Sequence, residues 1–409
     1  MLIVMKFGGS SLATNDRIEN VAQIIMNKAA EGNRVVVVVS AQGKTTDALI
    51  EKGKSVSDMV QPRENDVLLS AGEQMSSSLV AMKLNAEGCA AVSLLGWQAG
   101  IMTDANHGNA SITDVNAERI ISELDKGNVV VVAGFQGVDG ENDITTLGRG
   151  GSDTTAIALA AALGADVCYI YTDVSGVFSA NPSVASDAVK HDEISYDEML
   201  EMSSLGAKVL HNRSVSMAKR SGVEFEVRSS FDDKSGTKIR KFAAKKDVTG
   251  IVCDSNIAMI TVSGIECGES TCRLFELLAD KNIPIDVIIR SQGSDKSTGT
   301  VCFSVASHIC GWVSDVINAK KDEIGFDLIT AEYNMAKVSA VGLGLADSCS
   351  VAAVMLSELN ALDIHPRYIT TGEIRISVII PRFMAQEAEK RLNSAFFGKK
   401  EEGGTVGER

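Results

Sequence analysis

Positive charge, closely spaced cysteines and long apolar runs are all scarce in this sequence. Lysine and arginine total 39 against 53 aspartates and glutamates, a net charge of -14, so no extended basic surface is available for nucleic acid. The 8 cysteines include no CxxC pair and the 5 histidines show no ligand spacing, which argues against a zinc or haem site and favours reduced thiols. No apolar run approaches membrane-spanning length and the first residues lack the features of a signal peptide, so we expect a soluble, cytoplasmic protein without membrane association.

What remains is an ordinary globular composition. The 409 residues are 45% apolar and 22% charged, which is enough for two or three domains with buried cores. Because the overall balance is acidic, a small anionic ligand would need a local concentration of positive charge.

One stretch, at Thr145–Ala165, has the features of an anion-binding loop: TTLGRGGSDTTAIALAAALGA. Glycines allow the backbone to approach a ligand closely, and the first amides of the helix that follows have no intrahelical partners. Arg149 adds a planar guanidinium suited to a carboxylate or a phosphate. The alternative is a surface loop with an ordinary helix N-cap at Ser152 or Asp153.

The first half of the chain repeats a pattern of strand, turn and helix. Leu2–Phe7 is a short apolar strand that leads into a glycine turn and a helix at Asn15–Ala30, and Arg34–Ser40 begins the same sequence of elements again. Runs that are apolar on both faces are typical of buried parallel strands joined by crossover helices. Further strands are predicted at 90–95, 129–133, 166–172 and 223–228.

Charged residues follow several of these strands, where the carboxyl ends of a parallel sheet gather ligands. Lys6, Lys44, Arg149 and Lys208 would supply positive charge, and Glu73, Asp153 and Asp173 would supply ligands for a substrate amine or a magnesium ion. Taken singly, Lys6 could be a solvated edge lysine and Glu73 a solvent-facing helical glutamate. The GKT at Gly43–Thr45 lacks the first glycine of a P-loop, since Val38 stands there.

A charged stretch poor in apolar residues separates two halves of the chain. It predicts a first domain at 1–230, a connector at 231–248, and then a degenerate repeat whose copies each contain strand, helix, strand and strand. The copies are placed at 249–328 and 329–398, and the tail at 399–409 is expected to be disordered.

Seven motifs in a fixed order resemble the aspartokinases. They are KFGGSS at Lys6–Ser11, SAQGKTTDAL at Ser40–Leu49, SAGEQMSSSLVA at Ser70–Ala81, GFQG at Gly134–Gly137, TLGRGGSDTTA at Thr146–Ala156, YTDVSGVFSANP at Tyr171–Pro182 and GAKVLH at Gly206–His211. The resemblance implies an α/β amino-acid-kinase fold, with a mostly parallel open sheet sandwiched by helices, followed by two βαββ-type α+β ACT domains.

The family implies transfer of the γ-phosphoryl group of MgATP to the β-carboxylate of L-aspartate, giving 4-phospho-L-aspartate for lysine, threonine, methionine and diaminopimelate synthesis. A carboxylate is already ionised at neutral pH, so the reaction needs positioning and charge stabilisation but no general base. The resemblance further implies Mg²⁺ carried by ATP with no dedicated metal site, no organic prosthetic group and a homodimer, and it leaves open an amino-acid effector at the ACT domains.

The same resemblance assigns roles to matching positions. Lys6 and Asp153 are the expected catalytic pair, with Lys6 on the transferring phosphoryl group and Asp153 holding the Lys6 side chain in place. The residues expected to bind aspartate are Thr46, Glu73, Arg149, Gly150, Gly151 and Ser152, with Glu73 on the α-ammonium and Arg149 on the α-carboxylate. The residues expected at the nucleotide, besides Lys6, are Gly8, Gly9, Ser40, Thr172, Asp173, Phe178 and Lys208.

This chain departs from the family pattern after Asp173. The usual GVYTADPR is replaced by GVFSANPS, which would remove a hydroxyl, a carboxylate and an arginine near ATP. Two alternatives stay open: another phosphotransferase of the amino-acid-kinase fold, such as an N-acetylglutamate or uridylate kinase, and a catalytically silent ACT regulatory protein.

Overall fold

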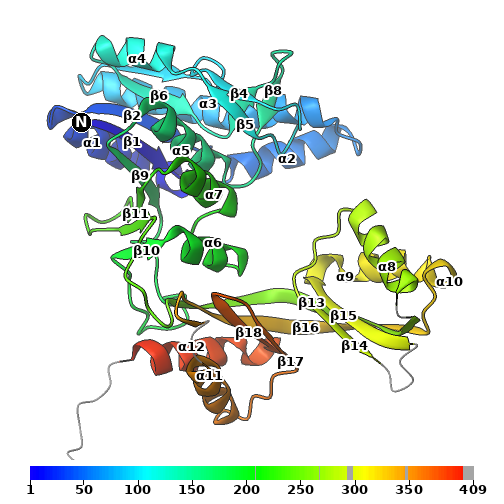
Figure 1. Cartoon of the computed structure of the whole chain (residues 1–409). Helices are drawn as coiled ribbons and strands as arrows, with labels where there is room; N and C mark the ends of the chain where they lie inside the picture. Colours follow the sequence, from blue (N-terminus) through cyan, green and yellow to red (C-terminus); the bar gives the residue numbers. More distant parts are fainter. Residues whose placement is uncertain (208, 267, 293–297, 346–348, 399–409) are drawn as a thin grey trace, which may run out of the picture. The chain divides into compact units, whose positions relative to one another are not determined.

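The computed structural model describes residues 1–398 except 208, 267, 293–297 and 346–348 (Figure 1). The chain forms two compact units. The first contains Met1–Phe178 and Lys190–Ala244, and the second contains Ser179–Val189 and the chain from Lys245 onward. The expected tail at 399–409 lies outside the described residues.

An eight-stranded sheet forms the centre of the first unit, with strand order β10-β12-β11-β9-β1-β2-β6-β3. Its strands are β1 (Leu2–Phe7), β2 (Arg34–Val39), β3 (Ala91–Leu94), β6 (Val129–Ala133), β9 (Val167–Thr172), β10 (Glu193–Ser195), β11 (Phe225–Ser229) and β12 (Thr237–Arg240). From β11 to β3 the strands are parallel, and β12 is antiparallel to β11. The predicted parallel sheet is therefore present.

The alternation of side chains along β1 decides which helix meets which residue. Ile3, Met5 and Phe7 lie in a core with residues of α1 (Asn15–Ala30) and α3 (Pro62–Ala86). Lys6 points to the opposite face, where α5 (Gly151–Leu163) packs along β1, β2 and β9. Period-two alternation thus places the one lysine of this apolar strand beside α5.

A smaller sheet that the sequence did not indicate completes the first unit. It has the strand order β5-β4-β7-β8 and consists of β4 (Ile101–Thr103), β5 (Ile112–Val115), β7 (Gln136–Val138) and β8 (Ile144–Thr146). The remaining helices are η1 (Gly9–Leu12), α2 (Thr45–Val56), α4 (Glu118–Asp125), α6 (Tyr196–Ser204) and α7 (Asn212–Ser221). Strand β8 leads directly into the glycine loop before α5.

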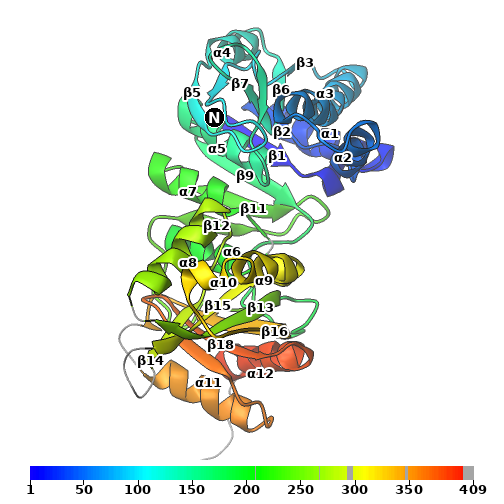
Figure 2. The ribbon, with the colours of Figure 1, turned by 90° about the vertical axis from the view of Figure 1, so that its right-hand side faces the viewer.

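The second unit contains a six-stranded antiparallel sheet with the order β14-β15-β13-β16-β18-β17 (Figure 2). Its strands are β13 (Gly250–Glu266), β14 (Ile288–Gln292), β15 (Thr298–Ala306), β16 (Leu328–Val341), β17 (Tyr368–Thr371) and β18 (Arg375–Pro381). Its helices are α8 (Glu269–Asp280), η2 (Ser307–Ile309), α9 (Cys310–Asn318), α10 (Lys321–Ile324), α11 (Ser350–Asn360), η4 (Arg382–Met384) and α12 (Ala385–Phe397).

Two long strands join the repeat copies and correct the boundary predicted between them. Ile251, in the first part of β13, packs in one core with α11 and α12, whereas Ile260 in the same strand packs in another core with α8 and α9. Ile329 and Val338 divide β16 between the two cores in the same way. The core of the first copy thus includes the start of β16, and the core of the second copy includes the start of β13. Both segments lie across the predicted 328/329 boundary, because β13 and β16 are long enough to contribute to both cores.

The first domain boundary is also corrected. The expected connector at 231–248 contains β12, which pairs with β11 in the sheet of the first unit. In addition, Ser179–Val189 leaves the predicted 1–230 domain and belongs to the second unit, where Ala180 and Ala185 lie in the core with α11 and α12.

Among the helices of the described residues, none combines the length and the apolar character needed to cross a bilayer. The cysteines that the structure describes carry no disulfide.

Candidate active site

Four loops meet at the carboxyl edge of the parallel sheet. The amide of Gly8 donates to the carbonyl of Tyr171 at 3.3 Å, that of Ser40 to Phe7 at 3.1 Å, and that of Gly134 to Val39 at 3.0 Å. These contacts extend the ladder beyond β9, β1, β2 and β6, so the loops after these strands are held side by side. The predicted convergence of the loops is therefore present.

Lys6 and Asp153 face each other at this edge. Their side chains are nearly buried, and the Lys6 Nζ lies 2.6 Å from the Asp153 Oδ1. An ammonium group carries three protons, so Lys6 can donate to Asp153 and still donate to a further acceptor. A Cβ added to Gly8 would lie 3.5 Å from the Lys6 Nζ, which places this charge against the turn after β1. Loss of either partner would leave the other charge buried and unpaired.

Glu73 reaches the same edge from α3. Gly72 allows the approach, because a Cβ there would lie 2.8 Å from the Cβ of Ala41 in the loop after β2. The Glu73 Oε1 accepts the amide of Ala41 at 2.9 Å, whereas its Oε2 is buried and has no hydrogen-bond partner among the described residues. Burial raises the pKa of Glu73 to about 7, against the opposing effect of the Ala41 amide. The unpartnered oxygen favours a bound cation.

The glycine loop holds Arg149 out toward solvent. Gly148 and Gly150 have φ values of +71° and +69°, the left-handed region in which glycine avoids strain. Arg149 lies between them, is exposed, and forms no ion pair within the described part of the chain. It is therefore a free guanidinium at the entrance to α5.

The other residues predicted at the substrate lie close to this loop or to the loop after β2. Gly151 and Ser152 begin α5 and are buried, and a Cβ at Gly134 would lie 2.8 Å from the Ser152 Oγ. Thr46 is half-buried in the first turn of α2. The loops after β2, β6 and β8 thus contribute to one site.

The residues predicted at the nucleotide follow β9 and β1. Thr172 ends β9, and its hydroxyl donates to the exposed Asp173 carboxylate at 3.0 Å. Gly9 approaches the loop after β2 so closely that a Cβ would lie 2.6 Å from a carbonyl oxygen. Phe178 is half-buried and forms an isolated bridge with Lys190. Lys208 lies outside the described residues.

The departures from the family pattern after Phe178 lie in the segment Ser179–Val189 of the second unit. The Ser179 Oγ donates to the Asn393 Oδ1 at 2.7 Å, and the amide of Asn181 donates to Glu389 at 3.1 Å, both within the second unit. The loss of a carboxylate and an arginine near ATP stays a prediction.

A buried network that the sequence did not reveal ties the glycine loop to α3. The carboxylate of Asp66 is completely buried and accepts hydrogen bonds from Thr146 Oγ1 at 2.5 Å, from the Gly108 amide at 2.9 Å and from His107 Nδ1 at 2.9 Å. Asp66 lies two turns before Glu73 on α3, and Thr146 directly precedes the glycine loop. A polar residue near the start of a helix gives no sequence signal that distinguishes this role from solvation.

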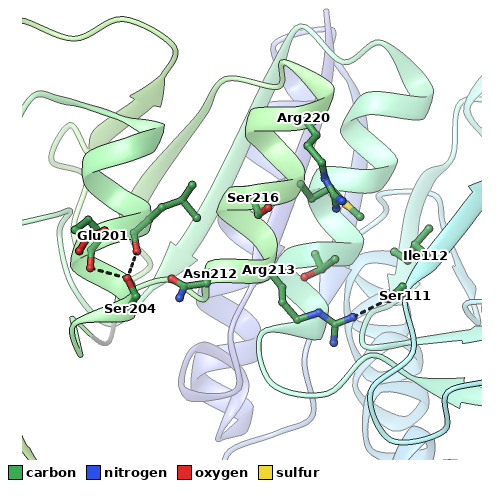
Figure 3. Close-up of a pocket in the computed structure, with 11 residues that line it drawn as sticks. Ser111, Ile112, Glu201, Ser204, Asn212, Arg213, Ser216 and Arg220 are labelled. Atoms are coloured by element: carbon green, nitrogen blue, oxygen red, sulfur yellow. Dashed lines mark hydrogen bonds between the residues drawn. The ribbon is translucent and has the colours of Figure 1, made fainter. Parts of the chain in front are cut away.

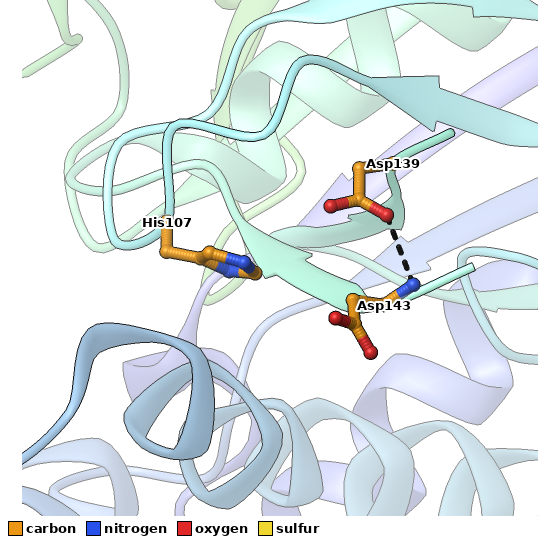
Figure 4. A group of neighbouring side chains, drawn as sticks. All are labelled: His107, Asp139 and Asp143. Carbon is orange, nitrogen blue, oxygen red and sulfur yellow. Dashed lines mark hydrogen bonds between the residues drawn. The ribbon is translucent and has the colours of Figure 1, made fainter. Parts of the chain in front are cut away.

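One group of side chains among the described residues could hold a metal ion. His107, Asp139 and Asp143 each offer a ligand atom within 4.8 Å of the others, although their sequence spacing gave no sign of it (Figure 4). The Arg63 guanidinium holds the pKa of Asp143 below its usual range, and Asp139 accepts the amides of Glu141 and Asp143 at 3.0 Å. These carboxylates are therefore compensated without an ion, and we assign no metal to them.

Comparison with known proteins identifies the family. The amino acid kinase family model matches residues 1–229, and an ACT domain model matches residues 338–396. Aspartokinase 2 of Bacillus subtilis is 45% identical over 399 residues, which cover 97% of each chain. This chain belongs to the aspartokinase family. The aspartokinase of Thermus thermophilus is 43% identical over 97% of this chain and 98% of its own.

A solved aspartokinase has the same fold. Escherichia coli aspartokinase III, crystallised with aspartate and ADP, superposes with a TM-score of 0.81 over 97% of this chain and 100% of its own, at 25% identity. The resemblance predicted from the ordered motifs is confirmed, as is the fold class of an amino-acid-kinase sheet followed by ACT domains.

Proposed function

We propose that this aspartokinase transfers the γ-phosphoryl group of MgATP to the β-carboxylate of L-aspartate. The observation that carries the proposal is that Glu73 and Arg149, on elements that lead to the sheet edge near Lys6, each have no ion-pair partner among the described residues. The buried Glu73 Oε2 lacks a partner, and the exposed Arg149 guanidinium is free of ion pairs among the described residues. An amino acid offers the ammonium and the carboxylate that these two groups lack.

The residues at this edge suit a reaction between two anions. A β-carboxylate oxygen attacks the γ-phosphorus, the bond between this phosphorus and the β–γ bridging oxygen breaks, and ADP leaves with that oxygen. Lys6 would stabilise the charge on the transferring group, and Asp153 would hold its ammonium in place. Arg149 and Glu73 would fix the α-carboxylate and the α-ammonium, with hydroxyls of Thr46 and Ser152 nearby.

The nucleotide would lie over the turn after β1 and the end of β9. Gly9 there allows close backbone approach, and Ser40, Thr172, Asp173, Phe178 and Lys208 are the further residues proposed around it. The Mg²⁺ would be carried by the ATP phosphates, where it would neutralise charge on the phosphate oxygens.

An acyl phosphate product can be trapped with hydroxylamine. The purified enzyme with MgATP and hydroxylamine should form aspartyl hydroxamate from L-aspartate and little hydroxamate from L-glutamate or N-acetylglutamate, and it should release little ADP when UMP is the acceptor. Lysine, threonine and methionine, added in turn, would identify an effector of the ACT domains. Aspartate binding without ATP turnover would instead favour a silent regulatory protein.

We also propose a homodimer formed through the six-stranded sheet. Its edge strands β14 and β17 carry the exposed side chains Ile288 and Ile369, and unpaired strand edges of this kind favour pairing with another sheet. Light scattering at micromolar concentration should give twice the monomer mass, and a monomer mass would contradict the proposal.

A further inference from the structure

Arg213, in the first turn of α7, binds two separate loops of the first unit. Its Nη1 donates to the carbonyl of Leu147 and, at 2.6 Å, to the Asn109 Oδ1. Its Nη2 donates to the carbonyl of Ala110 at 2.6 Å and, at the limit of hydrogen-bond distance, to the Ser111 Oγ at 3.5 Å (Figure 3). One planar guanidinium thus joins α7, the 109–111 segment and the residue before Gly148.

The backbone around Arg149 has no room to relax between these elements. A Cβ at Gly148 would lie 3.0 Å from the Asn109 Oδ1 and 3.6 Å from the Arg213 Nη1. A Cβ at Gly150 would lie 2.3 Å from the Cβ of His211, two residues before Arg213. The glycines that flank Arg149 are therefore packed against the two segments that Arg213 connects.

The far side of the same loop is anchored to α3. Asp66 binds Thr146 and the amide of Gly108, and the Ala110 amide donates to the Thr146 carbonyl at 2.9 Å. Asp66 and Glu73 share a helix, so hydrogen bonds run from the helix that carries Glu73 to the loop that carries Arg149. Arg213 closes this connection at the end nearest Arg149.

We propose that Arg213 is a positioning residue for aspartate binding, and this inference rests on the proposed function. Through the Leu147 carbonyl, Arg213 fixes the loop conformation that presents Arg149 to the substrate α-carboxylate. A lysine cannot replace it, because an ammonium group lacks the planar fork that serves acceptors on two segments at once.

Arg213 also lines a cavity of about 430 Å³ between β5, α5, α6 and α7, which gives small solutes access to its position (Figure 3). If Arg213 is shortened to alanine, a guanidinium ion can enter and restore the missing donors. Arg220 lines the same cavity on the same helix and forms no ion pair in the described part of the chain, which makes it a matched control.

The test compares Arg213→Ala, Arg213→Lys and Arg220→Ala with the unaltered enzyme in the hydroxamate assay. Both Arg213 variants should raise the KM for aspartate about 10- to 100-fold, because small displacements of a binding group have effects of this size, while the KM for ATP changes less than about twofold. Millimolar guanidinium should lower the raised KM of Arg213→Ala and leave Arg213→Lys and Arg220→Ala unchanged.

An equal rise in both KM values, an unchanged KM for aspartate, or a loss of kcat alone would overturn the inference. If Arg213→Ala does not fold, Asn109→Ala removes one acceptor of the same guanidinium and should still raise the KM for aspartate selectively; an unchanged KM there would also count against it. Failure of the unaltered enzyme to phosphorylate aspartate would refute the proposed function instead, so the two failures are distinguishable.

Discussion

Replacement of Glu73 by glutamine should stabilise the unliganded protein while weakening aspartate binding. Burial raises the pKa of Glu73 from 4.5 to about 7. Between these values the carboxyl group ionises in the unfolded chain but stays protonated in the folded one, so its contribution to stability falls as pH rises. Above pH 7 the cost of burying the ionised carboxylate is complete, and the difference between the two pKa values corresponds to about 3 kcal/mol.

Glutamine carries no charge and can still accept the Ala41 amide, so Glu73→Gln should avoid this penalty. The free energy of unfolding of the variant should match that of the unaltered protein near pH 4.5 and exceed it by up to about 3 kcal/mol above pH 7. Each kcal/mol corresponds to about 2–4 °C in Tm. Thermal unfolding at pH 5 and pH 8 without ligands measures the difference. In the unaltered enzyme, the KM for aspartate should rise as pH falls below 7, because protonation removes the partner of the α-ammonium group.

Glu123→Gln is the matched control. Glu123 is also buried, but its hydrogen bonds to Lys126 and Asn128 hold its pKa below the usual range. Its carboxylate therefore contributes stability above the unfolded pKa, and the substitution should lower the Tm at pH 8. Equal stability of Glu73→Gln and the unaltered protein at pH 8, with an unchanged KM for aspartate, would refute the reasoning.

Three further predictions concern the loop, the catalytic pair and the second unit. Lys6→Ala should lower kcat about 10²- to 10³-fold and Arg149→Ala should mainly raise the KM for aspartate; effects on kcat alone in both would contradict the division of roles. Gly150→Ala should raise the KM for aspartate as Arg149→Ala does, because it places a Cβ at a φ of +69° and 2.3 Å from a neighbouring side chain. An unchanged KM for aspartate in steady-state kinetics would argue against this. Ser179→Ala should cost about 1–3 kcal/mol in urea unfolding, because it leaves the buried Asn393 Oδ1 without its donor; an unchanged midpoint would contradict it.

The parts of the fold that the sequence predicted have strong local patterns. The run of valines in β2 is apolar on both faces, which is typical of a buried parallel strand. The glycine loop and the helix after it have a distinct composition. Lys6 lies near the end of such a strand and Asp153 in the first turn of the helix after the glycine loop, and the family resemblance paired the two. The seven ordered motifs then assigned the family.

The parts that the sequence missed depend on contacts between distant segments. Strands β4, β7 and β8 contain three residues each, too few to display a period of two. The roles of Asp66 and Arg213 come from acceptors and donors far away in the chain, and a charged residue on a helix is ordinarily solvated. Likewise β13 serves two cores without any break in its sequence.

The excursion of Ser179–Val189 means that neither unit is a contiguous stretch of chain. The chain passes between the units after Phe178, after Val189 and after Ala244. Expressed alone, residues 1–244 would carry Ala180 and Ala185 without the core that buries them, and residues from 245 onward would lack these two side chains. The segment Ser179–Val189 therefore cannot be buried until the ribosome has synthesised the C-terminal part of the chain, and proteolysis within 179–189 would damage the core of the second unit.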